Sequence, residues 1–277
     1  MKHALIGNTI VCEIRPQEMA ENWRLALENP SLRQESYSHT YDNKDSDWNG
    51  TTERCLDRLF ENKFDIPAPS EEVKAALENL LGSEAYNKKR RKRAMSEHDG
   101  EYDFDRQWDR KPFYSTQRHY TASEKRIELE INFNFHAGVT KTEIEEFSSL
   151  CSQIINHLEN AGYLCRVELV IKNISATICG KSTDTRVLCK DFGEYTSVLD
   201  VTKWLCTEFY RRCWFHHQRM IPSKHYNTKA THGLGGVNNT GFYSEKGKLR
   251  ISPGNGRYDV QHTSRVLDAV AVAIGKK

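Results

Sequence analysis

The feature that most constrains the fold is a strand–helix–strand pattern between residues 126 and 171. Residues 126–136 alternate apolar with polar side chains, which is the period of a strand that buries one face. A second apolar run at 164–171 predicts another strand after an intervening helix. Together the three segments predict a βαβ unit, in which the two strands are parallel and the crossover is right-handed.

The helix of this unit carries start and stop signals. Thr140 and Glu143 match a capping box, in which each side chain satisfies a free backbone amide at the helix start. Apolar residues then recur at helical spacing between Ile144 and Leu158, and Gly162 provides the left-handed conformation that ends many helices. The pattern predicts a helix over this range that packs on the sheet.

The rest of the chain divides by pattern. Residues 16–28 show helical periodicity, and two further helices are predicted, with Thr52 and Ser70 as their N-caps. We predict an α/β (or α+β) fold. Its parts are a helical N-terminal region at 1–85, a charged connector at 86–125 and a Rossmann-like α/β domain at 126–277.

Further elements complete the predicted α/β domain. The long loop among them is rich in Gly, Asn and His. The elements are a strand at 186–192, a helix from Thr196 or Asp200 to about Gln218, a loop at 222–247, a strand at 249–251 and a helix at 263–274.

Composition excludes some functional classes. The chain has 277 residues with 40 Lys and Arg against 38 Asp and Glu, so its net charge of +2 excludes a uniformly basic coat but allows a local basic patch. No run of about 18 apolar residues predicts a membrane-spanning helix. The eight cysteines form no Cys-x-x-Cys pair, and the N-terminus lacks the regions of a signal peptide. We therefore expect reduced, mostly buried thiols and a cytoplasmic protein.

The carboxyl end of the first strand of the βαβ unit is one candidate site. Ligands of open α/β sheets bind beyond the carboxyl ends of strands, and there Asn132, Asn134 and His136 are expected to project on one face. We predict that these three residues bind a ligand or a partner protein. A hydrogen-bonded strand face without a ligand is the alternative.

A run of six consecutive cations is the second candidate site. Such a run can neutralise phosphates, and the aromatic and basic residues that follow it suit single-stranded DNA or RNA. The alternative is a solvated linker that pairs with the acidic segment at 97–105. The six residues are Lys88, Lys89, Arg90, Arg91, Lys92 and Arg93.

Two further patterns bear on metal chemistry. Four alternating carboxylates could collect a cation, but no second carboxylate cluster with a neighbouring Lys or His accompanies them. His216 and His217 superficially match a relaxase-type nickase, yet adjacent residues on a helix point about 100° apart and so face different surroundings. The four carboxylates are Asp99, Glu101, Asp103 and Asp105.

The order of several short motifs resembles a phage-encoded family of uncharacterised proteins. The family's Trp-x-Gly-Thr turn corresponds to Trp48–Thr51, and its Leu-Glu-x-Ala-Gly-Tyr segment to Leu158–Tyr163. Its Gly-acidic-Asp segment corresponds to Gly100–Arg106, and its helix ending in an Arg-Arg pair and aromatics to Leu199–Phe215. The resemblance implies a viral source and an α/β domain, without an assigned activity.

The predicted βαβ core also resembles a von Willebrand factor A-type domain. Such domains ligate a divalent ion through Asp-x-Ser-x-Ser at the end of their first strand. Asn132-Phe-Asn-Phe-His136 keeps this spacing but replaces the anionic ligand with amides and an imidazole. The resemblance implies a Rossmann-like fold and protein binding. We predict no cofactor, with a divalent cation as the alternative.

These observations lead to one functional prediction and one alternative. We predict a non-catalytic phage accessory or structural protein that binds a phage or host protein through its α/β domain, in the host cytoplasm or in the virion. The alternative is a nucleic-acid-binding or processing protein that uses the cations at 88–93. The sequence leaves the oligomeric state open.

Overall fold

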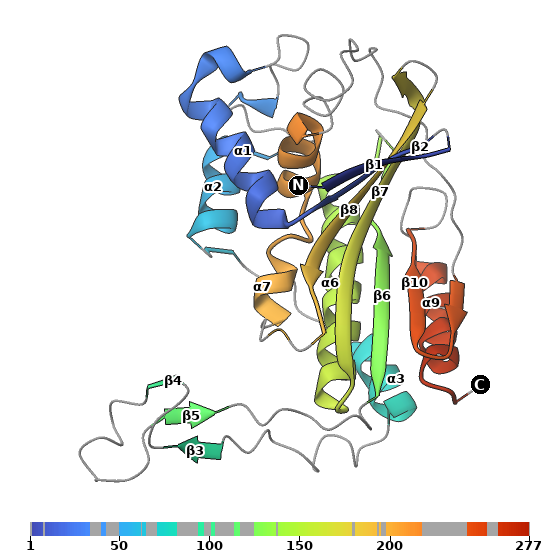
Figure 1. Ribbon diagram of the computed structural model, residues 1–277. Coiled ribbons are helices and arrows are strands. Elements are labelled where there is room, and N and C mark those ends of the chain that lie inside the picture. Colours follow the sequence, from blue (N-terminus) through green and yellow to red (C-terminus); the bar gives the residue numbers. More distant parts are fainter. Residues whose placement is uncertain are drawn as a thin grey trace.

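A seven-stranded mixed sheet forms the centre of the protein in a computed structural model (Figure 1). The strand order is β1-β2-β8-β7-β6-β10-β9, and α-helices accompany the sheet, so the predicted α/β or α+β fold class is confirmed. The structure describes residues 2–7, 9–33, 40–42, 50–61, 63–64, 71–81, 94–96, 101–102, 114–116, 125–136, 138–178, 181–192, 194, 198–217, 243–253 and 260–276.

The central strands follow the predicted βαβ pattern. Strand β6 (Arg126–Asn132) runs parallel to β7 (Leu164–Ile178), and α6 (Lys141–Asn160) connects them. The predicted capping box is present at the start of α6, and Gly162 after its end has a φ of 86°. Strand β8 (Lys181–Lys190) returns antiparallel beside β7, while β10 (Lys248–Ile251) lies parallel on the other side of β6.

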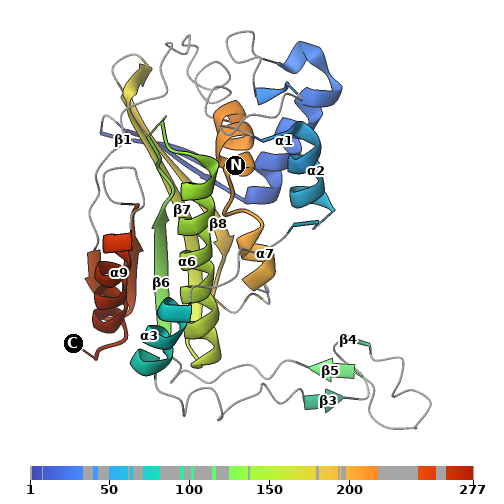
Figure 2. The ribbon, with the colours of Figure 1, turned by 180° about the vertical axis from the view of Figure 1, so that it is seen from behind.

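Helices cover one face of this sheet. Figure 2 shows α6, α3 (Glu71–Leu81) and α9 (Val260–Ala273) in front of the strands, and α3 contacts both of the other helices. Helix α6 buries an apolar stripe that includes Ile144, Phe147 and Ile154. The sheet residues of the same core are Ile127, Leu129, Ile131, Val167, Leu169, Ile171, Val187, Leu249 and Ile251.

The N-terminal region contributes strands as well as helices. Residues 2–14 form a hairpin of β1 (Lys2–Ile6) and β2 (Thr9–Ile14), in which Gly7 takes the positive φ of 60° that tight hairpin turns require. Strand β2 pairs parallel with β8, so the prediction that residues 1–85 are helical is wrong for this hairpin. Its pairing partner lies about 170 residues away, and no local pattern reveals such a partner.

The helices predicted for this region are present after the hairpin. They are α1 (Pro16–Glu28) and α2 (Thr52–Phe60), followed by α3, with the short 3₁₀-helix η1 (Pro30–Leu32) after α1. Thr51 rather than Thr52 caps α2, because its hydroxyl accepts a hydrogen bond from the Arg54 amide.

The helix predicted up to residue 218 is interrupted. Helix α7 (Val198–Thr202) ends in turns, and the chain becomes helical again before the π-helix η3 (Phe209–Trp214). The guanidinium group of Arg58 donates hydrogen bonds to the carbonyl oxygens of Thr202 and Lys203. These carbonyls are therefore satisfied from α2, and the chain can leave the helical path at that point.

Two smaller findings complete the architecture. Three short strands lie within the predicted connector and form a second antiparallel sheet in the order β3-β5-β4; strands this short leave no recognisable period in the sequence. Their ranges are β3 (Ala94–Ser96), β4 (Glu101–Tyr102) and β5 (Tyr114–Thr116), and β9 (Tyr243–Glu245) closes the main sheet beside β10. No helix in the described part of the chain is both long enough and apolar enough to cross a membrane.

Candidate functional site

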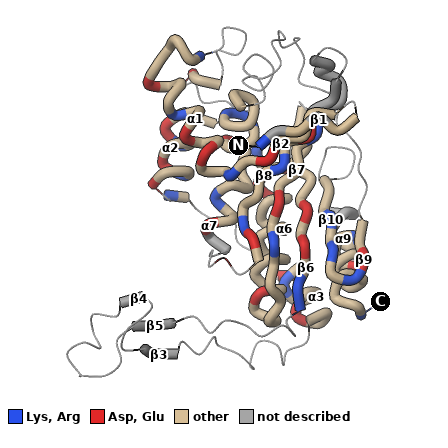
Figure 3. The backbone as a smooth tube through the Cα atoms, viewed as in Figure 1, with Lys and Arg blue, Asp and Glu red and all other residues tan. Residues whose placement is uncertain are grey.

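The main sheet has two chemically different faces. Along β6, for example, buried Ile127 and Leu129 alternate with Glu128 and Glu130, whose side chains point to the opposite side. Basic and acidic residues are interspersed along the strands (Figure 3). We call this second side the charged face. Its charged residues on β6, β7, β8 and β10 are Arg126, Glu128, Glu130, Arg166, Glu168, Lys172, Asp184, Arg186, Lys248 and Arg250.

Ion pairs join neighbouring strands across the charged face. Arg250 Nη2 on β10 donates to Glu130 Oε2 on β6 at 2.9 Å, and Arg250 Nε lies 2.7 Å from Glu130 Oε1. Arg186 Nη1 on β8 donates to Glu168 Oε2 on β7 at 3.2 Å, and Arg186 Nη2 lies 3.6 Å from Asp184 Oδ2. The register of the strands places Arg250 directly opposite Glu130, whereas Arg186 is opposite Val170 and reaches Glu168 diagonally.

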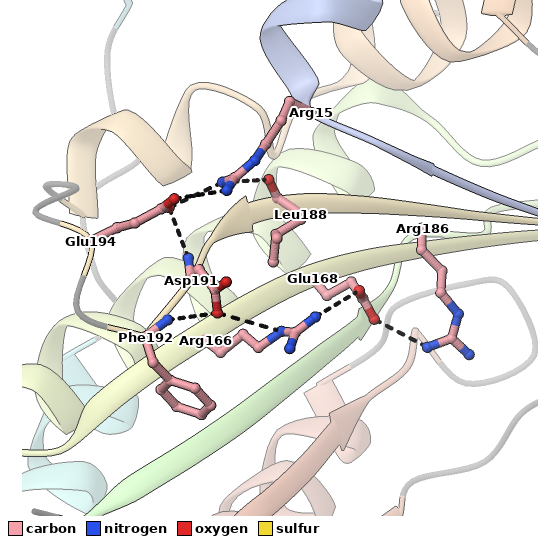
Figure 4. A network of polar contacts seen from close by, with 8 residues as sticks. All are labelled: Arg15, Arg166, Glu168, Arg186, Leu188, Asp191, Phe192 and Glu194. Atoms are coloured by element: carbon pink, nitrogen blue, oxygen red, sulfur yellow. Dashed lines mark hydrogen bonds and ion pairs between the residues drawn. The ribbon is translucent and has the colours of Figure 1, made fainter. Parts of the chain in front are cut away.

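The network continues to the end of β8 and the start of α1 (Figure 4). Arg166 lies 3.7 Å from Glu168 and 3.9 Å from Asp191. Glu194 accepts two hydrogen bonds from Arg15, at 3.0 and 2.7 Å, and a third from the Asp191 amide. Ion pairs and hydrogen bonds therefore connect the start of α1, β7, β8 and the residues after β8.

The charges of this network are partly shielded from water. The Glu168 side chain is 16% exposed and that of Arg186 is 33% exposed. Burial raises the pKa of Glu168 above its ordinary value, although Arg186 and Arg166 oppose this shift. The hydrogen bond from Arg15 lowers the pKa of Glu194. The face thus carries paired, half-buried charges that an approaching molecule can still reach.

The charged face offers hydrogen-bond donors and acceptors in alternation. Arginine and carboxylate side chains in alternation offer directional hydrogen bonds to a surface of complementary charge. Among the described residues, no three His, Cys, Asp or Glu side chains gather in a way that could hold a metal ion.

The predicted strand-end residues lie in different surroundings. Asn132 is buried and donates to Ser252 Oγ at 3.2 Å, and Asn134 is buried and donates to a backbone carbonyl of β7 at 2.7 Å. His136 is exposed, and its Nδ1 accepts a hydrogen bond from the Gly138 amide. The three side chains therefore do not share an exposed surface, and their binding of a ligand stays a prediction.

The predicted nucleic-acid-binding residues at 88–93 lie outside the described residues, as does most of the acidic segment that follows them.

The buried side chain of Arg212 connects the π-helix η3 to residues 40–52. Arg212 is fully buried, and its Nη1 donates to the Thr40 carbonyl and to Thr52 Oγ1, both at 3.0 Å. Its Nη2 donates to the carbonyls of Asp42, at 3.1 Å, and Gly50. The Gly-Thr turn and the Arg-Arg pair, two landmarks of the sequence, are thus in direct contact. The contact connects two parts of the protein to each other, because the groups that accept these hydrogen bonds from Arg212 are all protein atoms.

A buried carboxylate lies beside this arginine. Glu208 is 0% exposed, and its Oε1 lies 3.1 Å from Arg54 Nε and 3.9 Å from Lys141 Nζ. Within the described chain neither oxygen accepts a hydrogen bond of good geometry. Ion pairs with α2 and α6 therefore offset the cost of burying this charge.

The adjacent histidines 216 and 217 contact different partners. His216 Nδ1 lies 2.6 Å from the Tyr41 hydroxyl, whereas His217 Nε2 lies 3.4 Å from Cys12 Sγ. Burial raises the pKa of Cys12 to about 12, so its thiol stays protonated at neutral pH. The described cysteines are all free and buried, as expected: Cys12, Cys55, Cys151, Cys165, Cys189, Cys206 and Cys213.

Comparison with known families places the chain in one of them. A model described as Domain of unknown function (DUF7192) matches residues 11–266. The chain belongs to this family. The matched DUF7192 range runs from β2 into α9 and includes the charged face and the buried Arg212. No curated protein and no solved structure matches the chain.

The sequence contained a signal for the charged face of this DUF7192 protein. Charged residues recur at every second position in Arg166–Glu168, in Asp184–Arg186 and in Lys248–Arg250. Such spacing indicates a strand with one polar face, but the ion pairs also require the strand order and register. Period-two charges on several strands were the signal that could have identified the surface.

The turn at Gly50 supplies a test of the packing around Glu208. Gly50 has a φ of 62°, and a Cβ atom there would lie 2.8 Å from Glu208 Oε1. We expect Gly50→Ala to lower the free energy of unfolding by about 2–3 kcal/mol in urea denaturation, through backbone strain and displacement of the buried carboxylate. Gly7→Ala is the control, because Gly7 has a φ of 60° with no atom within 4 Å. Equal losses in both variants would contradict the close approach.

Proposed function

We propose that this protein is a non-catalytic binding module that recognises a partner protein through the charged face of its sheet. The observation that supports the proposal is the row of paired, half-buried charges, among them Arg250–Glu130 and Arg186–Glu168. All four side chains are between 16% and 33% exposed, so the ion pairs can be reached from solvent. A partner of complementary charge can therefore interact with these groups and gain specificity from their arrangement.

The proposed source and partner rest on the resemblance in the sequence. The order of motifs supports a phage accessory or structural protein whose partner is a phage or host protein, in the host cytoplasm or in the virion. The charged face adds that the partner surface carries both signs of charge, because basic and acidic groups alternate on the face.

Charge reversal on the face tests this proposal. The partner is first identified by chemical cross-linking to the intact protein in infected cells, and its affinity is then measured with both proteins purified. We expect Arg186→Glu combined with Arg250→Glu to weaken binding at least about tenfold and to reduce its dependence on salt.

A matched variant on α1 controls for general effects of charge. Arg24 is 46% exposed and forms an i,i+4 ion pair with Glu28. Both residues belong to α1 and not to the strands that carry the charged face. Arg24→Glu is expected to leave the affinity unchanged, and circular dichroism checks that this control and the double variant are both folded. Unchanged binding by the Arg186 and Arg250 double variant would overturn the proposal.

The six consecutive cations support a second candidate function, which is binding of DNA or RNA. A gel-shift assay at low salt with single-stranded oligonucleotides tests it. Reversal of Arg90, Arg91 and Lys92 to Glu should abolish binding, and an absence of binding by the wild-type protein at micromolar concentration would refute this function.

A further inference from the structure

The two edges of the main sheet differ in how they are protected. At one edge, β9 has only three residues and packs against α9. At the other edge, β1 has five residues, and within the described part of the chain its one pairing partner is β2. Natural sheets protect their edges with short strands, prolines, charges or covering helices, because free backbone groups can pair with another strand.

Strand β1 lacks most of these protective features. It contains no proline, and its single charged residue at pH 7 is Lys2 at its start. The side chains of Lys2, Ala4 and Ile6 are exposed, and Ile6 is 64% exposed, the highest value among the large hydrophobic residues that the structure describes as exposed. An edge strand with an exposed isoleucine is a favourable site for strand addition.

The sequence of β1 also allows it to pair with a second copy of the same strand. In an antiparallel pair of two β1 strands centred on Ala4, all five residues pair, and Lys2 of each chain lies opposite Ile6 of the other. No like charges oppose each other across the pair. Within its own chain, Lys2 is already opposite the exposed acidic residue Glu13 of β2. The aliphatic part of Lys2 can therefore cover Ile6 while its charge stays near a carboxylate.

We infer that β1 is a self-association edge, through which two copies of this chain pair antiparallel about a two-fold axis at Ala4. The occupant is a second copy because the edge is self-complementary and such pairing closes at two chains. The main sheets of the two chains become one continuous sheet. This inference concerns the sheet edge and is independent of the partner protein proposed for the charged face.

The dimer is expected to be weak. Five residues per chain form a small contact compared with the roughly 1,200–2,000 Å² of a standard stable interface. Sedimentation velocity on the full chain between about 1 and 200 µM should therefore show a concentration-dependent equilibrium between monomer and dimer. A wild-type protein that stays monomeric over this range would overturn the inference.

Charge pairs at Ala4 test the register and the two-fold axis. Ala4→Lys alone and Ala4→Glu alone should each be monomeric, because the axis places two like charges directly opposite each other. An equimolar mixture of the two variants should form a heterodimer. Circular dichroism checks that each variant is folded, and Leu25→Lys, an exposed position on α1, should dimerise as the wild type does. Failure of the mixture to associate would exclude this register.

Discussion

Replacement of Arg212 by methionine should lower the free energy of unfolding by about 3–5 kcal/mol. The guanidinium group satisfies the carbonyls of Thr40, Asp42 and Gly50 and the hydroxyl of Thr52, all of which lie around a fully buried position. Methionine fills similar space but donates no hydrogen bond. The buried acceptors then lose their partner, at roughly 1–3 kcal/mol for each unsatisfied group.

Urea denaturation of the wild type and the Arg212 variant measures this effect. Arg212→Lys should fall between them, because a single ammonium group cannot reach acceptors arranged around a planar fork. Arg265→Met on α9 is the control; its side chain is exposed, so the expected change is within about 0.5 kcal/mol. A loss of less than about 1 kcal/mol for Arg212→Met would show that the carbonyls find other donors.

The second large effect is a dependence of stability on pH that originates at His216. Burial lowers the pKa of this imidazole from 6.5 to about 4 in the folded protein, where its Nδ1 lies 2.6 Å from the Tyr41 hydroxyl. The unfolded chain therefore binds a proton at higher pH than the folded one. The contribution of this histidine to the free energy of unfolding is fully present above pH 6.5. It falls by about 1.36 kcal/mol for each pH unit below this value, so about 3 kcal/mol is lost as the pH approaches 4.

Free energies of unfolding at pH 7 and pH 4 test this mechanism. In His216→Gln the decrease between the two values should be smaller than in the wild type by about 3 kcal/mol, whatever the stability of the variant at pH 7. His136→Gln, at an exposed position, should keep the wild-type decrease. If His216→Gln and the wild type lose the same amount, the acid sensitivity resides in other groups.

Local signals predicted the elements that are stabilised locally. The capping box at Thr140, the apolar stripe of α6 and the stop at Gly162 are all present, because helix caps and helical periodicity depend on residues a few positions apart. The sequence alone also indicated a buried face on β6 and free cysteines in the core.

Contacts between distant segments could not be predicted in this way. Strand β2 joins the sheet through residues near 185, and the carbonyls that end α7 are satisfied by Arg58 from α2. The candidate strand-end residues Asn132 and Asn134 have partners on neighbouring strands, so their burial depended on the strand order. The charged face was visible as period-two charges on single strands, but not as a network.

The sequence by itself therefore determined the βαβ core and the helices that flank it, since hydrophobic periodicity and capping act over short distances. Only the tertiary structure decided which side chains are exposed and which are paired. It placed the landmark Gly-Thr turn against Arg212 in the core, where both are structural. It also placed the charges of β6, β7, β8 and β10 side by side on one face, because strand order and register bring together residues that are far apart in the chain.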